Sequence, residues 1–421
     1  MPWRHPSSSS LIDLGKRYWL PVYKPRELVL DHGLGSRVWD TEGRDYIDFG
    51  AGIAVNALGH QDPDLLEALT AQAHKLWHSS NVFYTEPPLR LAEELIQASG
   101  FAERVFLCNS GAEANEAAIK LVRKWAAGQG RPPERRVIVT FRGSFHGRTL
   151  ATVTATAQPK YQQGYEPLPE GFRYLDFNDA EALEQAFGAG DIAAVMLEPI
   201  QGEGGVVPAA PGFLERVRAL CDAHDALLVL DEIQCGMGRT GTLFAFAQEH
   251  IRPDIVTLAK ALGCGFPIGA MLAGPKVAGV MQYGDHGTTF GGNPLAAAVA
   301  RVALRKLGST EVLMNVERQG NDLREGLARI DRELGLFEEV RGRGLMLGAV
   351  LREPHQGRAG EMLDYAAAHG LLLLQAGPDV LRFVPPLVID DDELAEGLRR
   401  LHAALADYAG ASTCQSEGIC P

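Results

Sequence analysis

Two short apolar segments of this 421-residue chain each end abruptly in a charged residue. Residues 227–230 stop at Asp231, and the mostly apolar residues 255–259 stop at Lys260. Runs this short are typical of buried strands rather than buried helices. Glycine-rich sequence follows each charged residue and permits a tight turn of the backbone. The two segments therefore predict strands that end in an acid and in an amine.

Strands and helices are predicted to alternate through roughly residues 100–300. Further strands are expected at residues 105–108, 137–141 and 193–197, with helical segments between them. Such alternation predicts an α/β fold with a mostly parallel sheet and helices on both of its faces. Ligand-binding groups should then gather at the carboxyl ends of the strands. The residues at these ends are Cys108, Phe141, Glu198, Asp231 and Lys260.

The composition narrows the class of protein. With 46% hydrophobic residues, a chain of this length can bury a large core. The net charge of −13 argues against nucleic acid or an anionic membrane as the main partner. The chain start lacks the apolar core of a signal peptide, so a cytoplasmic location is expected. The six scattered cysteines are expected to be free thiols, although Cys414 and Cys420 share the C-terminal tail.

An acid and an amine at strand ends match the chemical needs of pyridoxal 5'-phosphate (PLP). A lysine holds the aldehyde of this cofactor as a Schiff base, and a carboxylate keeps its pyridine nitrogen protonated. A buried carboxylate also requires a cationic partner, because an unpaired charge is unfavourable in the core. We therefore expect PLP as the cofactor, with Lys260 and Asp231 as the catalytic residues. The pair His74 and His78 lacks a third ligand, and no metal site is expected.

Residues 109–120 predict a helix whose first turn could bind a phosphate. Ser110 and Glu113 have the spacing of a capping box. This pattern is explained equally well by a capped helix without a ligand. However, the segment follows a strand and precedes the acid and the lysine in the chain. We therefore expect the N–H groups of Ser110, Gly111 and Ala112 to face the phosphate.

Three charged or aromatic residues suggest a substrate pocket. Phe145 lies between glycines at a strand end and could pack flat on a cofactor ring. Arg148 has the planar guanidinium that suits a carboxylate. Arg382 lies in an otherwise apolar strand, where its charge must meet an anion. Core packing for Phe145 and a surface ion pair for Arg148 are the alternatives when each residue is considered singly.

Seven motifs, with these residues among them, resemble the class III PLP-dependent aminotransferases. This is the fold-type I branch that includes the ornithine and GABA aminotransferases. The resemblance covers roughly residues 20–405, with the motifs in the family's order. They are NSGAEANEAAIK, FHGRT, LEPIQGEGG, LDEIQCGMGRTG, TLAKALGCGFPIGA, HGTTFGGNPL and LRFVPPL. Three other segments, FGAGIAVNALGHQDP, HSSNVFY and FLCNSGAEANE, resemble the members that act on an acylated ornithine.

The resemblance implies a fold-type I transferase with two domains. Residues 61–308 would form the large PLP-binding domain. Residues 1–60, beginning with an irregular arm to about residue 20, and residues 309–408 would form a smaller α+β domain. Residues 409–421 are expected to be a disordered tail, and residues 158–175 a connection that contains Pro, Gly and Tyr.

The resemblance also implies roles around the cofactor. Lys260 would form the Schiff base and then move the proton between the substrate and the cofactor. Asp231 would pair with the pyridinium nitrogen, and Gln234 would donate to the ring oxygen. Ile233 and Phe145 would enclose the ring.

Other residues would hold the phosphate and the substrates. Thr289 from the second subunit of a homodimer would join the phosphate site, with Thr288 near the substrate. Arg148 would bind a substrate carboxylate, and Arg382 the α-carboxylate of 2-oxoglutarate or glutamate. Glu203 would neutralise Arg382 while the amine donor is bound.

The implied reaction is transfer of the δ-amino group of N-acetylornithine to 2-oxoglutarate. N-succinylornithine, succinyldiaminopimelate, ornithine and GABA remain alternative donors. Gly52 aligns where enzymes of free ornithine carry a tyrosine, which favours an acylated donor. Racemases, aminomutases and decarboxylases share the lysine and the acid, but they do not need two substrate-binding arginines. A PLP-binding regulator without turnover is the alternative from a different class.

Overall fold

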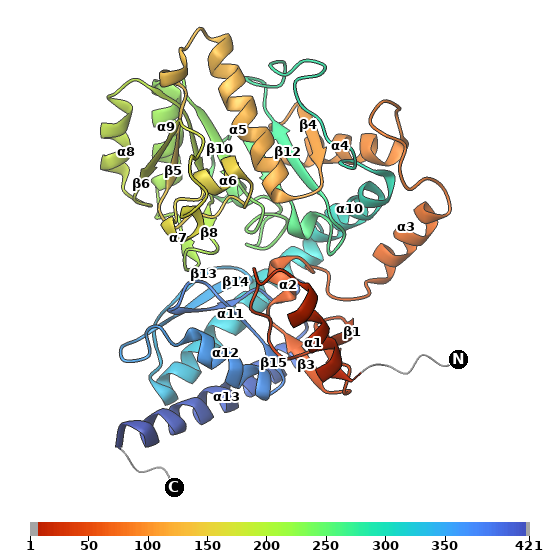
Figure 1. Ribbon diagram of the computed structural model, residues 1–421, viewed down its shortest axis with the longest axis vertical. Coiled ribbons are helices and arrows are strands. Elements are labelled where there is room, and N and C mark those ends of the chain that lie inside the picture. The colour runs from red at the N-terminus through yellow and green to blue at the C-terminus, as the bar shows by residue number, and fades with distance from the viewer. Residues whose placement is uncertain (1–6, 418–421) are drawn as a thin grey trace.

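The computed structural model describes residues 7–417, and side chains through residue 411. The middle of the chain forms a large sheet with helices around it, and the two ends of the chain form a second region (Figure 1). The N-terminal and C-terminal parts of the chain share a sheet, because β15 (Leu371–Leu372) pairs in parallel with β3 (Asp45–Asp48). No helix among residues 7–417 is long and apolar enough to cross a membrane.

The large sheet has seven strands in the order β4-β12-β11-β10-β7-β5-β6. In this sheet β12 runs opposite to the other six strands, which are parallel to one another. The mostly parallel sheet predicted from the sequence is therefore confirmed. Its strands are β4 (Arg104–Cys108), β5 (Val137–Phe141), β6 (Phe172–Leu175), β7 (Ile192–Leu197), β10 (Leu227–Asp231), β11 (Ile255–Leu258) and β12 (Gly269–Ala273).

Both faces of this sheet are buried, which explains the continuous apolar runs of its central strands. Successive side chains of a strand point to opposite faces. Leu227 and Val229 belong to the core cluster that includes α5 (Gly111–Gly128). Leu228 and Leu230 belong to the cluster that includes α9 (Phe213–Ala223). The strand that ends in Asp231 is thereby fixed from both sides.

Three helices pack together beside the sheet. The N-cap side chains Asp62 and Asn293 accept backbone N–H groups of the first turns of α3 and α10. Helix α10 packs against both α3 and α4. The helices of the large region are α3 (Pro63–Ala73), α4 (Glu86–Ser99), α5, α6 (Leu150–Ala155), α7 (Pro159–Gln162), α8 (Ala180–Phe187), α9 and α10 (Pro294–Leu307).

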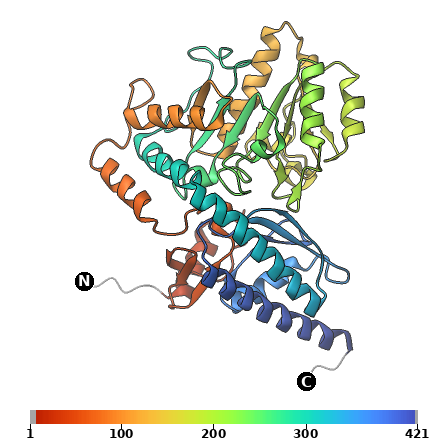
Figure 2. The ribbon, with the colours of Figure 1, turned by 180° about the vertical axis from the view of Figure 1, so that it is seen from behind.

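The second region contains two four-stranded sheets, β1-β2-β3-β15 and β13-β14-β17-β16. Its long helices α11 and α13 lie side by side (Figure 2). Its further elements are α2 (Ala51–Ala54), β1 (Leu30–Leu34), β2 (Arg37–Asp40), α11 (Thr310–Leu334), β13 (Phe337–Arg343), β14 (Met346–Leu351), α12 (Ala359–Ala368), β16 (Leu374–Gln375), β17 (Val380–Phe383) and α13 (Asp391–Glu417).

Three segments differ from the sequence prediction. The arm predicted to be irregular contains α1 (Ser8–Tyr18), which Ser7 caps by accepting the Ser10 N–H. The connection predicted at 158–175 contains α7 and the edge strand β6, which gains its hydrogen bonds only by pairing with β5. The tail predicted to begin at 409 continues α13 to Glu417, because no proline interrupts the helix. Residues 1–6 and 418–421, and the side chains of Cys414 and Cys420, lie outside the described part.

Candidate active site

A cavity of about 450 Å³ lies at the carboxyl ends of the parallel strands. Its volume falls in the range of small-molecule sites. Asp231 and Lys260 line this one cavity and do not face separate ones. The predicted site residues in its wall are Ser110, Gly111, Ala112, Phe145, Arg148, Glu203, Asp231, Ile233, Gln234 and Lys260.

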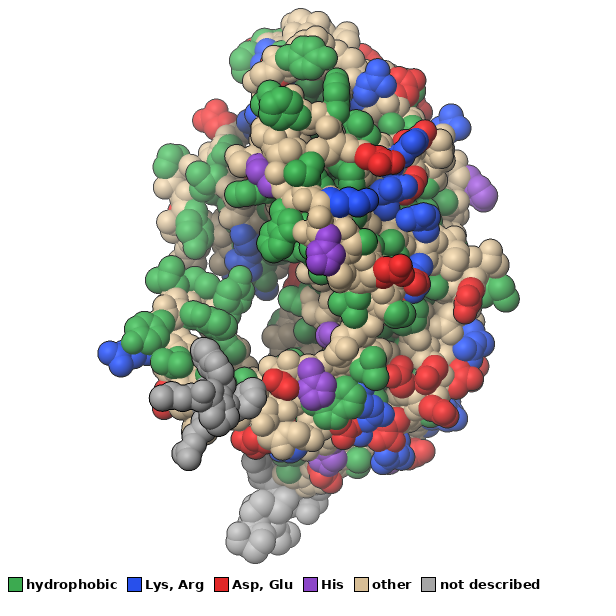
Figure 3. Space-filling model, turned by 90° about the vertical axis from the view of Figure 1, so that its right-hand side faces the viewer, with side chains coloured by type: hydrophobic (Ala, Val, Ile, Leu, Met, Phe, Trp, Pro, Cys, Tyr) green, Lys and Arg blue, Asp and Glu red, His purple; other side chains and the backbone are tan. Residues whose placement is uncertain are grey.

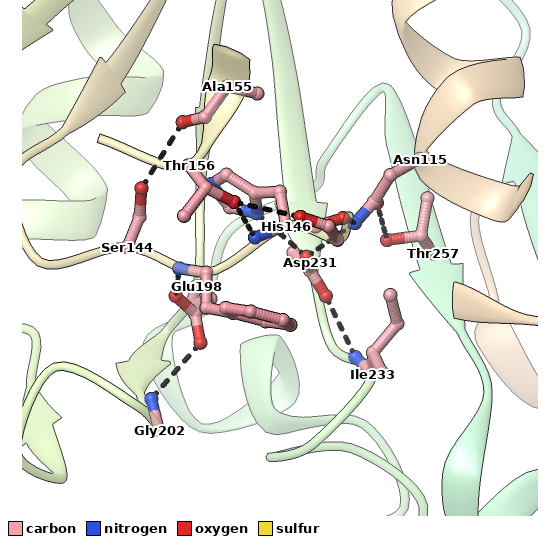
Figure 4. A network of polar contacts seen from close by, with 12 residues as sticks. Asn115, Ser144, His146, Ala155, Thr156, Glu198, Gly202, Asp231, Ile233 and Thr257 are labelled. Atoms are coloured by element: carbon pink, nitrogen blue, oxygen red, sulfur yellow. Dashed lines mark hydrogen bonds and ion pairs between the residues drawn. The ribbon is translucent and has the colours of Figure 1, made fainter. Parts of the chain in front are cut away.

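The Asp231 carboxylate is held at the end of β10 by three hydrogen bonds (Figure 4). Its Oδ2 accepts from Asn115 Nδ2 at 2.7 Å and from His146 Nδ1 at 2.8 Å. Its Oδ1 accepts from the Ile233 N–H at 3.1 Å. The Thr257 hydroxyl in turn donates to Asn115 Oδ1 at 2.7 Å. These contacts fix the position of the carboxylate of Asp231, a residue that is only 3% exposed.

The neighbouring carboxylate of Glu232 turns away from the cavity. It accepts the backbone N–H groups of Ala245 and Phe246, each at 2.7 Å. Burial raises the pKa of the Glu232 carboxyl to about 7. Of the two consecutive acids in the sequence, Glu232 therefore fastens a loop and Asp231 serves the cavity.

Sequence reasoning missed the histidine behind Asp231. Burial opposes protonation of His146, but the Asp231 hydrogen bond and the charges of Asp231 and Glu198 outweigh it and raise the imidazole pKa. Glu198 accepts the N–H groups of Phe145 and Gly202 at 2.9 and 3.0 Å. Burial raises the pKa of the Glu198 carboxyl to about 7 against the opposing charge of His146. The position of His146 directly after Phe145 in the FHGRT motif is the sequence signal that could have identified it as a site residue.

Lys260 follows β11 and has a left-handed backbone, with φ of 45°. Such a conformation is strained for a residue with a side chain and is common at functional sites. Lys260 as a whole residue is half-buried in this chain, and burial of its amine is the main cause that lowers the pKa of that group. The charge of Glu203 opposes this effect, and that of Arg382 reinforces it. A lowered pKa increases the unprotonated fraction that can act as a nucleophile or base.

The N-terminus of α5 opens into the cavity. Ser110 caps the helix by accepting the Glu113 N–H at 3.2 Å. The first N–H groups of an α-helix have no acceptor within the helix. Gly111 is required by packing, because a Cβ there would lie 2.7 Å from the Cδ1 of Ile233. Donors, helix dipole and missing side chain together suit an anionic group.

The predicted contact between Glu203 and Arg382 is present. Arg382 Nη1 donates to Glu203 Oε1 at 2.5 Å and to Gln234 Oε1 at 3.1 Å. The side chain of Arg382 is 3% exposed and that of Glu203 is 25% exposed. The buried Arg382 Nε has no partner among the described residues. The arginine is thus fixed, while its carboxylate partner reaches solvent.

Three predicted residues do not line the cavity of this chain. Arg382 lies behind Glu203, as described above. Thr288 receives a hydrogen bond from Asn109 at 3.0 Å, and Thr289 is exposed. Within residues 7–417, no group of three or more His, Cys, Asp or Glu side chains is placed to hold a metal ion.

The family model for "Aminotransferase class-III" matches residues 21–405. The chain belongs to the class III aminotransferases. The cofactor of this aminotransferase is therefore pyridoxal 5'-phosphate. The chain is 74% identical over 391 residues to acetylornithine aminotransferase of Xanthomonas campestris pv. campestris, covering 93% of this chain and 96% of the relative.

Two further relatives bear on the substrate. A crystal structure of N-acetylornithine aminotransferase from Stenotrophomonas maltophilia K279a is 64% identical, with a TM-score of 0.84, and covers 95% of this aminotransferase and 100% of that chain. A relative from Pseudomonas aeruginosa named succinylornithine transaminase/acetylornithine aminotransferase is 52% identical over 390 residues, covering 93% and 95% of the two chains.

The residues of the cavity fit the cofactor. The lysine, a buried carboxylate and an open helix N-terminus line one space. They match, in turn, an aldehyde, a protonated pyridine nitrogen and a phosphate. A Cβ at Gly111 would come 2.7 Å from Ile233, a residue expected beside the ring, so glycine lets the helix start and Ile233 lie together.

Proposed function

We propose that this aminotransferase transfers the δ-amino group of N2-acetyl-L-ornithine to 2-oxoglutarate, giving N-acetylglutamate 5-semialdehyde and L-glutamate. The observation that carries the proposal is the unequal pair of arginines. Arg148 lines the open cavity, whereas Arg382 is buried under Glu203. This arrangement offers one carboxylate site at all times and a second site only when Glu203 moves. The names of the relatives support an acylated ornithine as the donor.

The cofactor-binding residues would act as follows. When bound, PLP supplies a ring that takes up the electrons left on a substrate carbon after its proton is removed. Asp231 would hold the positive charge of the pyridine nitrogen, and Gln234 would contact the ring oxygen. Phe145 and Ile233 would enclose the ring.

The phosphate-binding residues would act at the start of α5. Ser110, Gly111 and Ala112 would donate to the phosphate, which faces the positive end of the helix. Thr289 of the second subunit would complete this site. Thr288 would lie near the substrate.

Lys260 would hold the cofactor aldehyde and then move a proton. Its lowered pKa favours the unprotonated amine that accepts a proton from the substrate carbon. The protonated amine would then deliver that proton to the C4′ carbon of the cofactor. Because Lys260 would serve first as the base and then as the acid, one side chain can carry out both steps of this proton transfer.

Glu203 would switch the pocket between its two substrates. With Glu203 on Arg382, the pocket presents little positive charge to the amine end of the donor, which carries no carboxylate. With Glu203 displaced, Arg382 can bind the α-carboxylate of 2-oxoglutarate. Arg148 would bind the remaining carboxylate in each half of the reaction.

A panel of amine donors tests this function. Glutamate formed from 2-oxoglutarate should be greatest with N-acetylornithine and much less with ornithine or GABA. Equal or greater use of free ornithine would contradict the proposal. N-succinylornithine is a second candidate donor, favoured by the double name of the Pseudomonas relative. Its use at a similar rate would extend the donor class to acylated ornithines in general.

We further propose a homodimer whose interface completes the site. Val82, Phe83 and Tyr84 are 81%, 70% and 90% exposed. Asn81 fastens this segment to the loop that carries Thr289 by donating to the carbonyls of Thr288 and Gly291. On this side of the molecule, hydrophobic side chains gather around a hollow (Figure 3). If a second copy covered these exposed side chains, the loop that carries Thr289 in one subunit would lie near the cavity of the other subunit.

Light scattering tests the dimer directly. A mass of twice 45.5 kDa is expected in solution. A fully active monomer would contradict the proposed role of Thr289. We also propose a cytoplasmic location, supported by the free thiols Cys108, Cys221, Cys235 and Cys264.

A further inference from the structure

The guanidinium of Arg148 rests against an aromatic ring that does not line the cavity. Its central carbon lies 3.9 Å from the ring centroid of Tyr161 and 5.4 Å from that of Phe145. Arg148 is exposed, and no carboxylate of the described residues forms an ion pair with it. An exposed arginine without an acidic partner usually samples many rotamers. Here aromatic contacts, rather than an ion pair, hold the cation at the cavity wall.

The ring of Tyr161 is itself fixed. It belongs to α7 and meets Phe145 edge to face, with centroids 6.0 Å apart and an angle of 85°. The adjacent Gln162 fastens α7, because its Nε2 lies within hydrogen-bond distance of the carbonyls of Val153, Thr154 and Thr156. The short helix therefore presents the ring in a defined place.

The position of the guanidinium over the Tyr161 ring has a chemical consequence. A ring that covers one face of a guanidinium leaves the N–H groups in its plane free for a carboxylate. Two parallel hydrogen bonds to the carboxylate are then possible. Lys160, whose Nζ lies 4.7 Å from the same Tyr161 centroid, adds positive charge nearby.

We propose that Tyr161 is a positioning residue that holds Arg148 ready for the carboxylate of the amine donor. The proposal rests on the acetylornithine aminotransferase function proposed above. Tyr161 thereby contributes to selection of donors that carry a carboxylate beside the acylated nitrogen. It acts through Arg148 and does not itself contact the reacting atoms.

The test compares N2-acetyl-L-ornithine with N-acetyl-1,4-diaminobutane, its analogue without the carboxylate. Tyr161→Leu should lower kcat/KM for acetylornithine about three- to tenfold, mainly through KM, as expected for loss of a cation–π contact. It should leave kcat/KM of the analogue, or its inhibition constant if turnover is too slow, near the wild-type value. Tyr161→Phe keeps the ring and should retain the wild-type preference for acetylornithine over the analogue. Tyr165→Leu, at an exposed tyrosine in the same segment, is the control.

A double-mutant cycle separates positioning from a general structural role. If Tyr161 acts through Arg148, Tyr161→Leu should have no further effect on acetylornithine in an Arg148→Met enzyme. Equal losses for both donors, an unchanged selectivity in Tyr161→Leu, or additive effects in the cycle would overturn the proposal. A wild-type enzyme that does not use acetylornithine would refute the proposed function instead, so the two failures are distinguishable.

Discussion

The two ends of the cavity hold their charges in different ways. At the deep end, the Asp231 carboxylate accepts from His146, Asn115 and the Ile233 N–H, and it is almost completely buried. At the substrate end, Arg382 meets the partly exposed Glu203, and Arg148 rests on aromatic rings. The partners of Asp231 are buried and fixed, whereas the carboxylate that neutralises Arg382 reaches solvent and Arg148 has no carboxylate partner among the described residues.

This difference matches the demands of a reaction with two successive substrates. A charge that serves the same cofactor atom in both half-reactions benefits from a rigid environment, since no reorganisation is needed. Charges that meet a different molecule in each half-reaction need partners that can be exchanged. We infer that changes at Asp231 should impair the chemistry with every donor, whereas changes at the substrate end should alter selection among donors.

The largest effect is expected at the deep end. Asp231→Asn removes the charge that would stabilise the protonated pyridine nitrogen. We expect kcat per bound PLP to fall about 10²- to 10³-fold for every donor, as for loss of other preorganised electrostatic contacts. Glu232→Gln is the matched control, because it removes a neighbouring buried acid that faces away from the cavity. A donor-dependent loss in Asp231→Asn would remove the distinction between the two ends.

A smaller and selective effect is expected from Glu203→Ala. Without its partner, Arg382 presents its charge to both substrates. The ratio of kcat/KM for acetylornithine to that for glutamate should fall about tenfold, since a hydrogen bond to a charged group contributes ~1.5 kcal/mol or more. Steady-state kinetics in both directions measure this ratio, and Glu203→Gln should show a weaker loss. Unchanged discrimination would argue against the switch.

The smallest effect is a shift in pH dependence. Burial lowers the Lys260 pKa, and the negative charge of Glu203 works against that effect. Removing this charge disfavours the ammonium, so the pKa should fall further in Glu203→Ala. PLP capture by the apoenzyme, followed by absorbance, needs the unprotonated amine. The pH at which PLP capture is lost on acidification should therefore lie below the usual lysine range. This pH should be lower still in Glu203→Ala. A shift to higher pH would show that Glu203 and Lys260 are not coupled as described.

The sequence predicted what depends on neighbouring residues in the chain. The apolar strands, the acid and lysine at their ends and the capped helix at Ser110 are local patterns with direct physical meaning. The partners of Asp231 could not be read in this way, because Asn115 and His146 are 116 and 85 positions away. Only the order of the strands brings them together.

Other features depend on contacts that leave no local signal. The edge strand β6 is defined by its pairing with β5. Tyr161 lies in a segment that was predicted only as a connection, and no local pattern places its ring against Arg148. The roles of Thr288 and Thr289 depend on a second subunit and remain predictions.

Covalent trapping of the cofactor tests the central claim most directly. Reduction of the PLP-loaded enzyme with sodium borohydride would fix the bond between the aldehyde and its lysine, and mass spectrometry of the peptides would locate it. We predict a single pyridoxyl adduct on Lys260, the lysine that shares its cavity with Asp231. A principal adduct on any other lysine would contradict the account.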